Sequence, residues 1–422
     1  METRASWELR QCRICGNPEL DPVLSLGVQH LTGVFPKMRT QKVSAAPLEL
    51  VKCHERDDGS CCGLLQLRHS FNPDEMYRAG YGYRSGINQT MTRHLQEIVH
   101  ELLEWVELRP RDVVLDIGSN DATLLRAYPH ADISVLGIDP CGESFRSFYP
   151  EHIALLPDYF SAKAFRAVFG ARQARIVTSI AMFYDLPAPV EFMLEIKDIL
   201  ADDGIWMFEQ SYMPRMLEMN AYDTVCHEHL EYYGLRQIRW MTERAGLKIL
   251  DVELNDSNGG SFRVAVTHEE SGRQPRSDRW RRVWQDEQRR GLHTLEPYRA
   301  FRENVFRHRD QLLEHLHGIR GRQETVLGYG ASTKGNVILQ FCGLTEQDIA
   351  VIAERNPEKY GCFTPGTLIP IVSEDEVHAR RPDYLLALPW HFRDEFLRRE
   401  RPYLEGGGKL LFPLPHIETV GR

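Results

Sequence analysis

Short apolar runs alternate with amphipathic segments along the chain from residue 76 onward. Leu95 to Leu108 has helical periodicity, and the apolar run Val113 to Ile117 stands directly before a Gly-Ser-Asn-Asp turn and a predicted helix. A second apolar run, ISVLGID, ends at Asp139. Strand, turn and helix in this order are typical of the first unit of a doubly wound α/β sheet.

The alternation continues through the middle of the chain. Strands are predicted at Arg175 to Ile180, Gly204 to Gln210 and Gly259 to Thr267. Helices are predicted near Pro189 to Leu200 and Arg236 to Ala245. These elements complete one α/β domain.

Residues 269–323 are strongly charged, and their aromatic side chains recur at intervals that fit helical faces. The aromatic positions are Trp280, Trp284, Tyr298, Phe301 and Phe306. We therefore expect a helical connector. After it, ETVLGYGASTKGNVIL predicts a strand at 326–328, a glycine turn at 330–335 and a helix from Asn336, which together begin a second α/β domain.

The second glycine turn matches neither a Walker loop nor a dinucleotide fingerprint. It does offer backbone N–H groups at a helix N-terminus together with Lys334, which suits an anionic group. A purely structural turn is the alternative interpretation.

Composition and charge narrow the class of protein. A chain of 422 residues with 42% hydrophobic and 26% charged content can form two or three domains. The net charge of −9 and the scattered arginines argue against a nucleic-acid partner. No apolar run approaches the ~20 residues of a membrane span, and the N-terminus lacks an apolar signal segment. We expect a soluble cytoplasmic protein with no membrane partner.

Five of the nine cysteines lie in the first 62 residues, at Cys12, Cys15, Cys53, Cys61 and Cys62. A C-x2-C pair followed by a distant second pair is typical of a tetrahedral four-cysteine zinc site. Such a site has no open coordination position, so a bound zinc ion would be structural. Unrelated buried cysteines are the alternative.

The first glycine turn suits a cofactor without a pyrophosphate, such as S-adenosylmethionine, because it lacks the full G-x-G-x-x-G pattern. We assign Gly118, Ser119 and Asn120 to the methionine portion of this cofactor. Asp139 follows the second strand, where ribose hydroxyls arrive in such folds.

Three further residues complete the predicted cofactor site. Asp116 is expected to support the turn, and Asp158 with Tyr159 to contact adenine. Asp158 could instead cap the helix that begins near SAKAF.

The stretch CHEHLEYYGL, residues 226–235, contains two histidines and two carboxylates. A zinc-protease helix needs histidines one turn apart, whereas His227 and His229 are two residues apart and would share one side of an extended segment. A polar surface turn is disfavoured because Leu230, Tyr232 and Tyr233 favour burial. The remaining interpretation is acid/base chemistry.

The ordered motifs of the chain resemble those of the nucleotide-sugar C-methyltransferases of deoxysugar biosynthesis, such as the tetronitrose and mycarose enzymes. The matching motifs are C-x2-C, CGLLQL, Y-x-Y-x-S-G, DIGSND, FEQSY, HEHLEYY, GGSFRV and GYGASTKGN. The resemblance implies an α/β protein with an N-terminal zinc-binding domain (1–75), a central Rossmann-like methyltransferase domain that binds S-adenosylmethionine (76–268), the helical connector (269–323) and a C-terminal Rossmann-like domain (324–422) that contributes to nucleotide-sugar binding. It also places the fourth zinc ligand at Cys62.

The resemblance further implies a dTDP- or GDP-linked 4-keto-6-deoxyhexose as substrate, methylated at C3 between the domains. In the mechanism that we expect, His229 removes the C3 proton, and the 4-keto group accepts the charge. Glu228 would orient the substrate or stabilise the charge. Tyr81 and Tyr83 would donate hydroxyl groups to the enolate.

The chain departs from the family pattern at two places in the expected substrate pocket. Cys226 stands where relatives often have tyrosine, and Phe183 with Tyr184 stands where many have histidine. The substrate contacts that we expect are Ser85, Tyr184, His227, Tyr232, Lys334 and Asn336.

Two other functions compete with this one. In a nicotinamide-dependent nucleotide-sugar oxidoreductase, GYGASTKGN would bind the dinucleotide. In a non-catalytic zinc-bearing scaffold, Glu228 and His229 would lie on the surface. The sequence does not fix the oligomeric state, and we favour a monomer.

Overall fold

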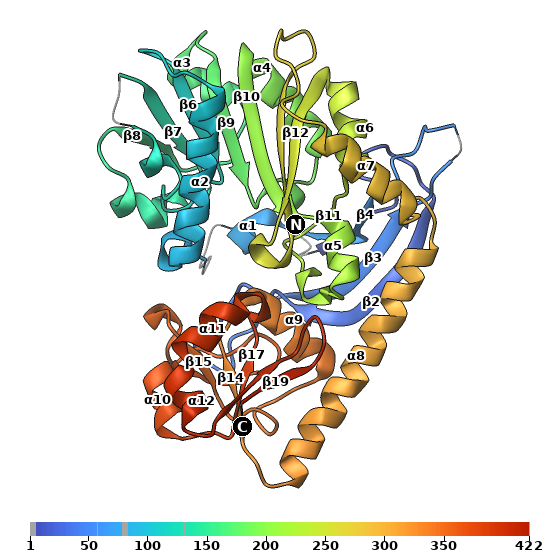
Figure 1. Cartoon of the computed structure of the whole chain (residues 1–422), viewed down its shortest axis with the longest axis vertical. Helices are drawn as coiled ribbons and strands as arrows, with labels where there is room; N and C mark the ends of the chain where they lie inside the picture. Colours follow the sequence, from blue (N-terminus) through green and yellow to red (C-terminus); the bar gives the residue numbers. More distant parts are fainter. Residues whose placement is uncertain (1–5, 57, 78–82, 130–131, 422) are drawn as a thin grey trace.

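The computed structural model describes residues 6–56, 58–77, 83–129 and 132–421. In Figure 1 a central α/β domain lies above a C-terminal α/β domain, and strands of the N-terminal region run beside both. The long helix α8 (Glu296–Gly321) passes along one side from the upper to the lower domain.

The N-terminal region is built on a four-stranded sheet with the order β11-β4-β3-β2. Strands β2 (Leu20–His30), β3 (Ala45–Cys53) and β4 (Leu65–Leu67) come from this region, but β11 (Glu231–Tyr232) comes from the HEHLEYY stretch. A separate pair joins β1 (Ser6–Glu8) to β5 (His69–Phe71), and α1 (Pro73–Tyr77) follows. The zinc-binding region and the candidate catalytic segment therefore share one sheet.

The central domain contains a seven-stranded sheet with the order β12-β13-β10-β9-β6-β7-β8, in which β13 runs antiparallel to the other six strands. Its strands are β6 (Val113–Ile117), β7 (Ser134–Ile138), β8 (Ile153–Leu156), β9 (Ala174–Ile180), β10 (Leu200–Ser211), β12 (Leu247–Asn255) and β13 (Ser261–His268). Its helices are α2 (Gln89–Trp105), α3 (Ala162–Phe169), α4 (Pro189–Ile199), α5 (Met213–Glu218) and α6 (Leu235–Ala245). All residues of β6 are buried, as expected for a strand covered on both faces.

The prediction of a helix after the Gly-Ser-Asn-Asp turn is wrong. The chain forms turns there and then only a short 3-10 helix, η2 (Leu125–Ala127). Asn120 and Ala122 have φ angles of 48° and 59°, and left-handed residues cannot continue a right-handed helix. Helix α2 also begins earlier than predicted, because the Asn88 side chain accepts hydrogen bonds from Thr90 N and Met91 N.

The connector is helical, as predicted, and consists of α7 (Arg279–Arg289) and α8. Tyr298 and Phe301 of α8 are buried.

The C-terminal domain has a six-stranded sheet with the order β16-β15-β14-β17-β18-β19, of which only β19 is antiparallel. Its strands are β14 (Val326–Tyr329), β15 (Ile352–Glu354), β16 (Ile371–Ser373), β17 (Tyr384–Ala387), β18 (Lys409–Phe412) and β19 (Glu418–Val420). Its helices are α9 (Thr333–Cys342), α10 (Glu374–Ala379), α11 (Arg393–Arg399) and α12 (Arg401–Glu405).

Two hydrophobic clusters tie the N-terminal region to the rest of the chain. One joins the zinc knuckle, which is the Cys12–Cys15 turn together with Cys53 and Cys62, to a face of the central sheet. The other joins β2, β3 and β4 to α8 and the C-terminal domain. None of the helices in the described ranges combines the length and the apolar character that crossing a bilayer requires. The shared cores leave the HEHLEYY stretch between the two α/β domains and the zinc-binding region.

Candidate active site

The four predicted zinc ligands converge. The sulfur atoms of Cys12, Cys15, Cys53 and Cys62 all lie within 4.8 Å of one another. The Sγ–Sγ distance is 3.4 Å between Cys12 and Cys62 and 3.5 Å between Cys15 and Cys53. A tetrahedral site with Zn–S bonds of about 2.3 Å requires sulfur separations of about 3.8 Å, so the arrangement fits zinc. Cys61 lies outside the cluster.

The first glycine turn lies at the carboxyl end of β6 and is held by Asp139. Asn120 N donates to Asp139 Oδ2 at 2.7 Å, and Cys141 N donates to Asp139 Oδ1 at 2.6 Å. Gly118 has φ +74°, and a Cβ atom there would meet Met182 Cγ at 3.1 Å, so glycine is required. The turn opens at the strand ends, where α/β sheets bind their ligands.

Other predicted cofactor residues surround this turn. The Ser119 hydroxyl lies 2.8 Å from the Tyr149 hydroxyl, and Ser85 N donates to Asn120 Oδ1 at 3.0 Å. Asp116 is buried behind the turn, where Thr178 Oγ1 donates to its carboxylate at 2.6 Å. Burial raises the pKa of Asp116 to about 7.

Asp158 does not cap helix α3, contrary to the alternative considered for it. The Ser161 side chain caps that helix by accepting from Ala164 N, and Asp158 instead accepts from Tyr159 N. The Tyr159 ring is 37% exposed, and its hydroxyl donates to Asp74 at 3.2 Å. Both residues are exposed, in the segment between β8 and α3.

Of the two tyrosines predicted to stabilise an enolate, Tyr81 lies outside the described residues. Tyr83 is 46% exposed, and its carbonyl oxygen accepts from Asn120 Nδ2 at 3.2 Å. The backbone of this segment therefore lies against the cofactor turn. Ser85, predicted to bind substrate, contacts the same turn through its backbone N–H.

The His229 side chain has a fixed orientation. Its Nδ1 lies 2.8 Å from the carbonyl oxygen of Thr224, which can only accept, so Nδ1 carries the proton and Nε2 keeps its lone pair. The Tyr184 ring packs edge-on at 4.4 Å between centroids. Burial, together with the charge of Lys334, lowers the pKa of His229 to about 4. The imidazole is therefore a neutral base at ordinary pH.

A small pocket lies beside His229. The pocket is lined by Tyr184, Ser211, Met213, Met216, Thr224, His229, Glu231 and Tyr232. Tyr184 belongs to the loop after β9, and Met182 of the same loop lies against Gly118. One short loop thus contacts both the candidate base and the candidate cofactor turn.

Neighbouring residues of the HEHLEYY stretch face different directions. His227 is buried against Phe71, with Nε2 3.3 Å from Ala46 O, and burial lowers its pKa to about 4. Glu228 accepts from Thr32 Oγ1 at 3.2 Å and from Gly33 N at 3.2 Å. The segment is not extended here: it turns, with His229 N donating to Cys226 O, and His227 and His229 contact different partners.

The C-terminal domain contributes the N-terminus of α9. Lys334 Nζ donates to Asn258 O at 2.8 Å, and Asn336 Nδ2 donates to Thr32 O at 2.8 Å. Burial lowers the pKa of Lys334, and the nearby carboxylate of Asp223 opposes that shift. Trp390 Nε1 donates to Asp223 Oδ2 at 2.8 Å. Lys334 therefore bonds across the boundary between the C-terminal and central domains, and its charge acts on His229.

Sequence reasoning did not identify three residues of this region, Asp223, Thr224 and Trp390. Thr224 acts through its carbonyl oxygen, which no side-chain pattern marks. Asp223 and Trp390 meet across 167 positions of sequence, and spacing cannot reveal such a pair. The acid at 223 just before CHEHL was the one available signal.

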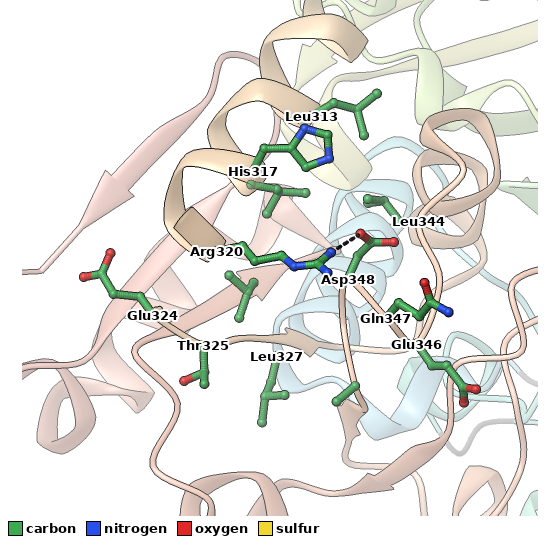
Figure 2. A pocket seen from close by; sticks show the side chains of 13 residues that line it. Leu313, His317, Arg320, Glu324, Thr325, Leu327, Leu344, Glu346, Gln347 and Asp348 are labelled. Atoms are coloured by element: carbon green, nitrogen blue, oxygen red, sulfur yellow. Dashed lines mark ion pairs between the residues drawn. The ribbon is translucent and has the colours of Figure 1, made fainter. Parts of the chain in front are cut away.

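A larger pocket, of about 220 Å³, lies away from these residues. Figure 2 shows that the end of α8 and the start of β14 line it, together with the segment 344–350. Arg320 and Asp348 point toward each other across it, 3.8 Å apart. It lies where β14 begins, whereas parallel sheets bind ligands at the strands' carboxyl ends. The residues around His229 are therefore the candidate active site.

The chain matches known protein families along most of its length. Residues 12–77 match a family described as "Putative zinc binding domain", residues 87–252 match "Methyltransferase domain", and residues 256–415 match "C-methyltransferase C-terminal domain". The chain is 29% identical over 413 residues to C-methyltransferase NovU of Streptomyces niveus, a match that covers 97% of this chain and 96% of that protein.

Solved structures give weaker likenesses. The plantazolicin methyltransferase BpumL is 12% identical and has a TM-score of 0.35, with 44% of this chain and 88% of that chain covered. An S-adenosylmethionine-dependent methyltransferase from Clostridium acetobutylicum is 11% identical and has a TM-score of 0.32, with 42% and 92% covered. At these TM-scores the likenesses add nothing to the assignment. The matches identify the chain as an S-adenosylmethionine-dependent methyltransferase with a zinc-binding domain, and it is similar to a C-methyltransferase over nearly its whole length.

Proposed function

We propose that this protein methylates C3 of a nucleotide-linked 4-keto-6-deoxyhexose and that His229 is the general base. The observation that carries the proposal is the His229–Thr224 hydrogen bond, which leaves Nε2 as a lone-pair acceptor beside the pocket. A carbon acid next to a ketone needs such a base within hydrogen-bond reach of its proton. The full-length likeness to a C-methyltransferase supports carbon as the methylated atom.

In the proposed reaction, the proton on C3 passes to His229 Nε2, and the electron pair of the C–H bond moves toward the 4-keto oxygen. Lys334 lies near enough to disfavour protonation of His229 electrostatically, and its positive charge would stabilise an anion formed there. Gly118, Ser119, Asn120 and Asp139 would hold S-adenosylmethionine, which would supply an electrophilic methyl group. Tyr184 and Tyr232 would exclude water beside the base.

A substrate panel tests this function. The full chain is incubated with methyl-labelled S-adenosylmethionine and with dTDP-, GDP- and CDP-linked 4-keto-6-deoxyhexoses. We expect label at C3 of at least one sugar, located by NMR of the product. Label on an oxygen or nitrogen atom, or none on any of the sugars, would overturn the proposal.

The pH profile of kcat/KM should lack the acid limb of an ordinary histidine. Because the pKa of His229 is lowered to about 4, the imidazole remains an unprotonated base down to about that pH. We expect nearly constant kcat/KM between pH 5.5 and 7.5 in initial-rate assays, where an ordinary histidine of pKa ~6.5 would lose about tenfold. A limb centred near pH 6.5 that His229→Ala abolishes would contradict this expectation.

Asp139→Ala should weaken binding of the demethylated cofactor about tenfold to a hundredfold, the scale of a lost hydrogen bond to a charged group. Asp139 also anchors Asn120 N, so Asp139→Asn, which keeps a carbonyl acceptor, should lose less. Isothermal titration of the zinc-loaded protein measures both. Asp112→Ala, just before β6 begins, is the control and should leave the affinity unchanged, whereas unchanged affinity in Asp139→Ala would remove Asp139 from the cofactor site.

A further inference from the structure

One buried side chain of the zinc knuckle reaches the candidate catalytic segment. Arg13 stands between the ligands Cys12 and Cys15, and only 3% of its side chain is exposed. Its Nη1 donates to Leu67 O at 2.5 Å and to Leu230 O at 3.4 Å, and its Nη2 donates to Ser70 Oγ at 2.7 Å. The guanidinium group thus joins the knuckle to the residue that follows His229.

The segment after His229 is held on both sides. Leu230 N donates to Tyr184 O at 2.9 Å, and Leu230 O accepts from Leu67 N at 2.9 Å. From Glu231 onward the chain is strand β11, which pairs with β4 of the zinc-binding region. His229 therefore stands between a hydrogen bond to Thr224 and a strand that Arg13 fixes to the knuckle.

Glu231 makes Arg13 difficult to replace. Within the described part of the chain, neither carboxylate oxygen of Glu231 has a hydrogen-bond partner, and its side chain is fully buried. Arg13 Nε lies 3.5 Å from Glu231 Oε1, and its positive charge opposes the rise in the pKa of Glu231 that burial causes. A buried carboxylate without such a partner is strongly destabilised. The pair therefore fixes where the backbone of β11 can lie.

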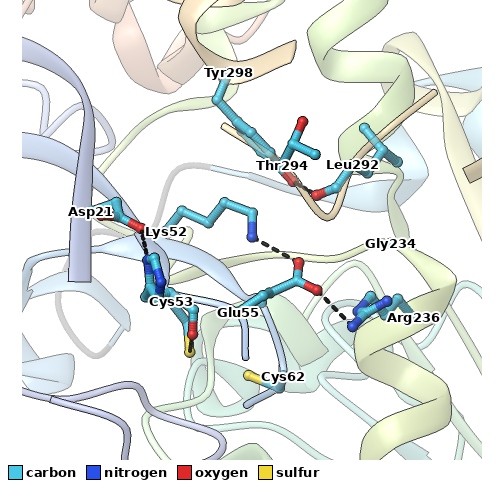
Figure 3. A network of polar contacts seen from close by, with 12 residues as sticks. Asp21, Lys52, Cys53, Glu55, Cys62, Gly234, Arg236, Leu292, Thr294 and Tyr298 are labelled. Atoms are coloured by element: carbon cyan, nitrogen blue, oxygen red, sulfur yellow. Dashed lines mark hydrogen bonds and ion pairs between the residues drawn. The ribbon is translucent and has the colours of Figure 1, made fainter. Parts of the chain in front are cut away.

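A second ionic link from the zinc loop gives a matched comparison. Figure 3 shows Glu55 between Lys52 and Arg236, at 2.8 Å and 2.6 Å. Glu55 lies two residues after the ligand Cys53 and is also largely buried, but its partner Arg236 belongs to α6. This link anchors the helix and does not touch Leu230 or Glu231.

From these contacts we propose that Arg13 is a positioning residue, which sets His229 for proton abstraction by fixing Leu230 and Glu231 to the zinc knuckle. The inference rests on the proposed role of His229 as the base. It gives the zinc-binding region a part in the reaction rate beyond its contribution to folding. A misplacement of a catalytic group by about 1 Å can cost on the order of a hundredfold in rate.

Arg13→Lys tests this role, because lysine keeps the charge near Glu231 but cannot direct bonds to Leu67 O, Leu230 O and Ser70 Oγ together. We expect the variant to retain its zinc and its cofactor affinity, with KM nearly unchanged and kcat lowered about tenfold to a hundredfold. Proton abstraction is also measured directly, as deuterium exchange at C3 of the dTDP- or GDP-linked 4-keto-6-deoxyhexose in D2O without methyl donor. This exchange should slow by the same factor as kcat. Arg13→Met should lose at least as much.

Glu55→Gln is the control and should lower the melting temperature while kcat stays within about twofold. A wild-type kcat in zinc-loaded Arg13→Lys overturns the inference. So does an equal loss of kcat in Glu55→Gln, because the effect would then be general loosening. If His229→Ala keeps full activity, the proposed function fails instead. The ¹⁵N NMR signals of His229 then decide the structural part, because Arg13→Lys should disturb its Nδ1–H tautomer and Glu55→Gln should not.

Discussion

His229→Ala is expected to lower kcat for methyl transfer by about a hundredfold to ten-thousandfold, the range that a positioned general base contributes. The reason is geometric. Thr224 O fixes the proton on Nδ1, so Nε2 is the basic atom, and alanine removes it without replacing it. Incorporation of labelled methyl groups into the sugar measures the loss, and titration with S-adenosylhomocysteine shows whether cofactor binding survives.

His308→Ala is the control for losing a buried imidazole. His308 belongs to helix α8, is only 4% exposed and forms hydrogen bonds with Pro413 O and the Tyr222 hydroxyl. It should cost stability and leave kcat nearly unchanged. A folded His229→Ala protein that binds cofactor and methylates at the wild-type rate would remove His229 from the mechanism.

Sequence reasoning succeeded where the determinants are local. The zinc site follows from the C-x2-C pair and the second cysteine cluster, because thiolates two residues apart can bind one ion from a tight turn. The geometry of the first glycine turn follows from an apolar strand, a glycine that needs a positive φ and an acid at the next strand end, and its cofactor contacts stay a prediction. Both depend on short stretches whose backbone is dictated by few residues.

The sequence was less informative where distant segments decide. The HEHLEYY stretch shows no period, and its side chains diverge because Phe71, Thr32 and Thr224 offer partners in different directions. Strand β11 is only two residues long and exists because β4 accepts it, so it has no strand signal of its own. The chain forms no α-helix directly after the first glycine turn because Asn120 and Ala122 have left-handed backbone conformations. An alanine in the sequence does not indicate such a conformation.

Cys62→Ser is expected to lose the zinc ion and, with it, most of the methyltransferase activity. Structural zinc contributes about 10 kcal/mol or more to the folding of small zinc domains. Strand β4 begins three residues after Cys62 and pairs with β11, so a loosened zinc loop frees the segment that carries His229. We expect less than about one-tenth of a metal equivalent by atomic absorption, a clearly lowered melting temperature and a loss of kcat of at least about a hundredfold.

Cys61→Ser provides the matched control, because the two neighbouring thiols are both buried but only Cys62 points into the cluster. It should retain one zinc ion per chain and near-normal kcat. Treating the wild-type protein with a chelator should reproduce the Cys62→Ser result, and adding zinc back should restore activity if the loop refolds. Full activity in a zinc-free protein would show that the metal site does not hold β4 and β11 in place. The link from the knuckle to the base would then depend on the shared hydrophobic core alone.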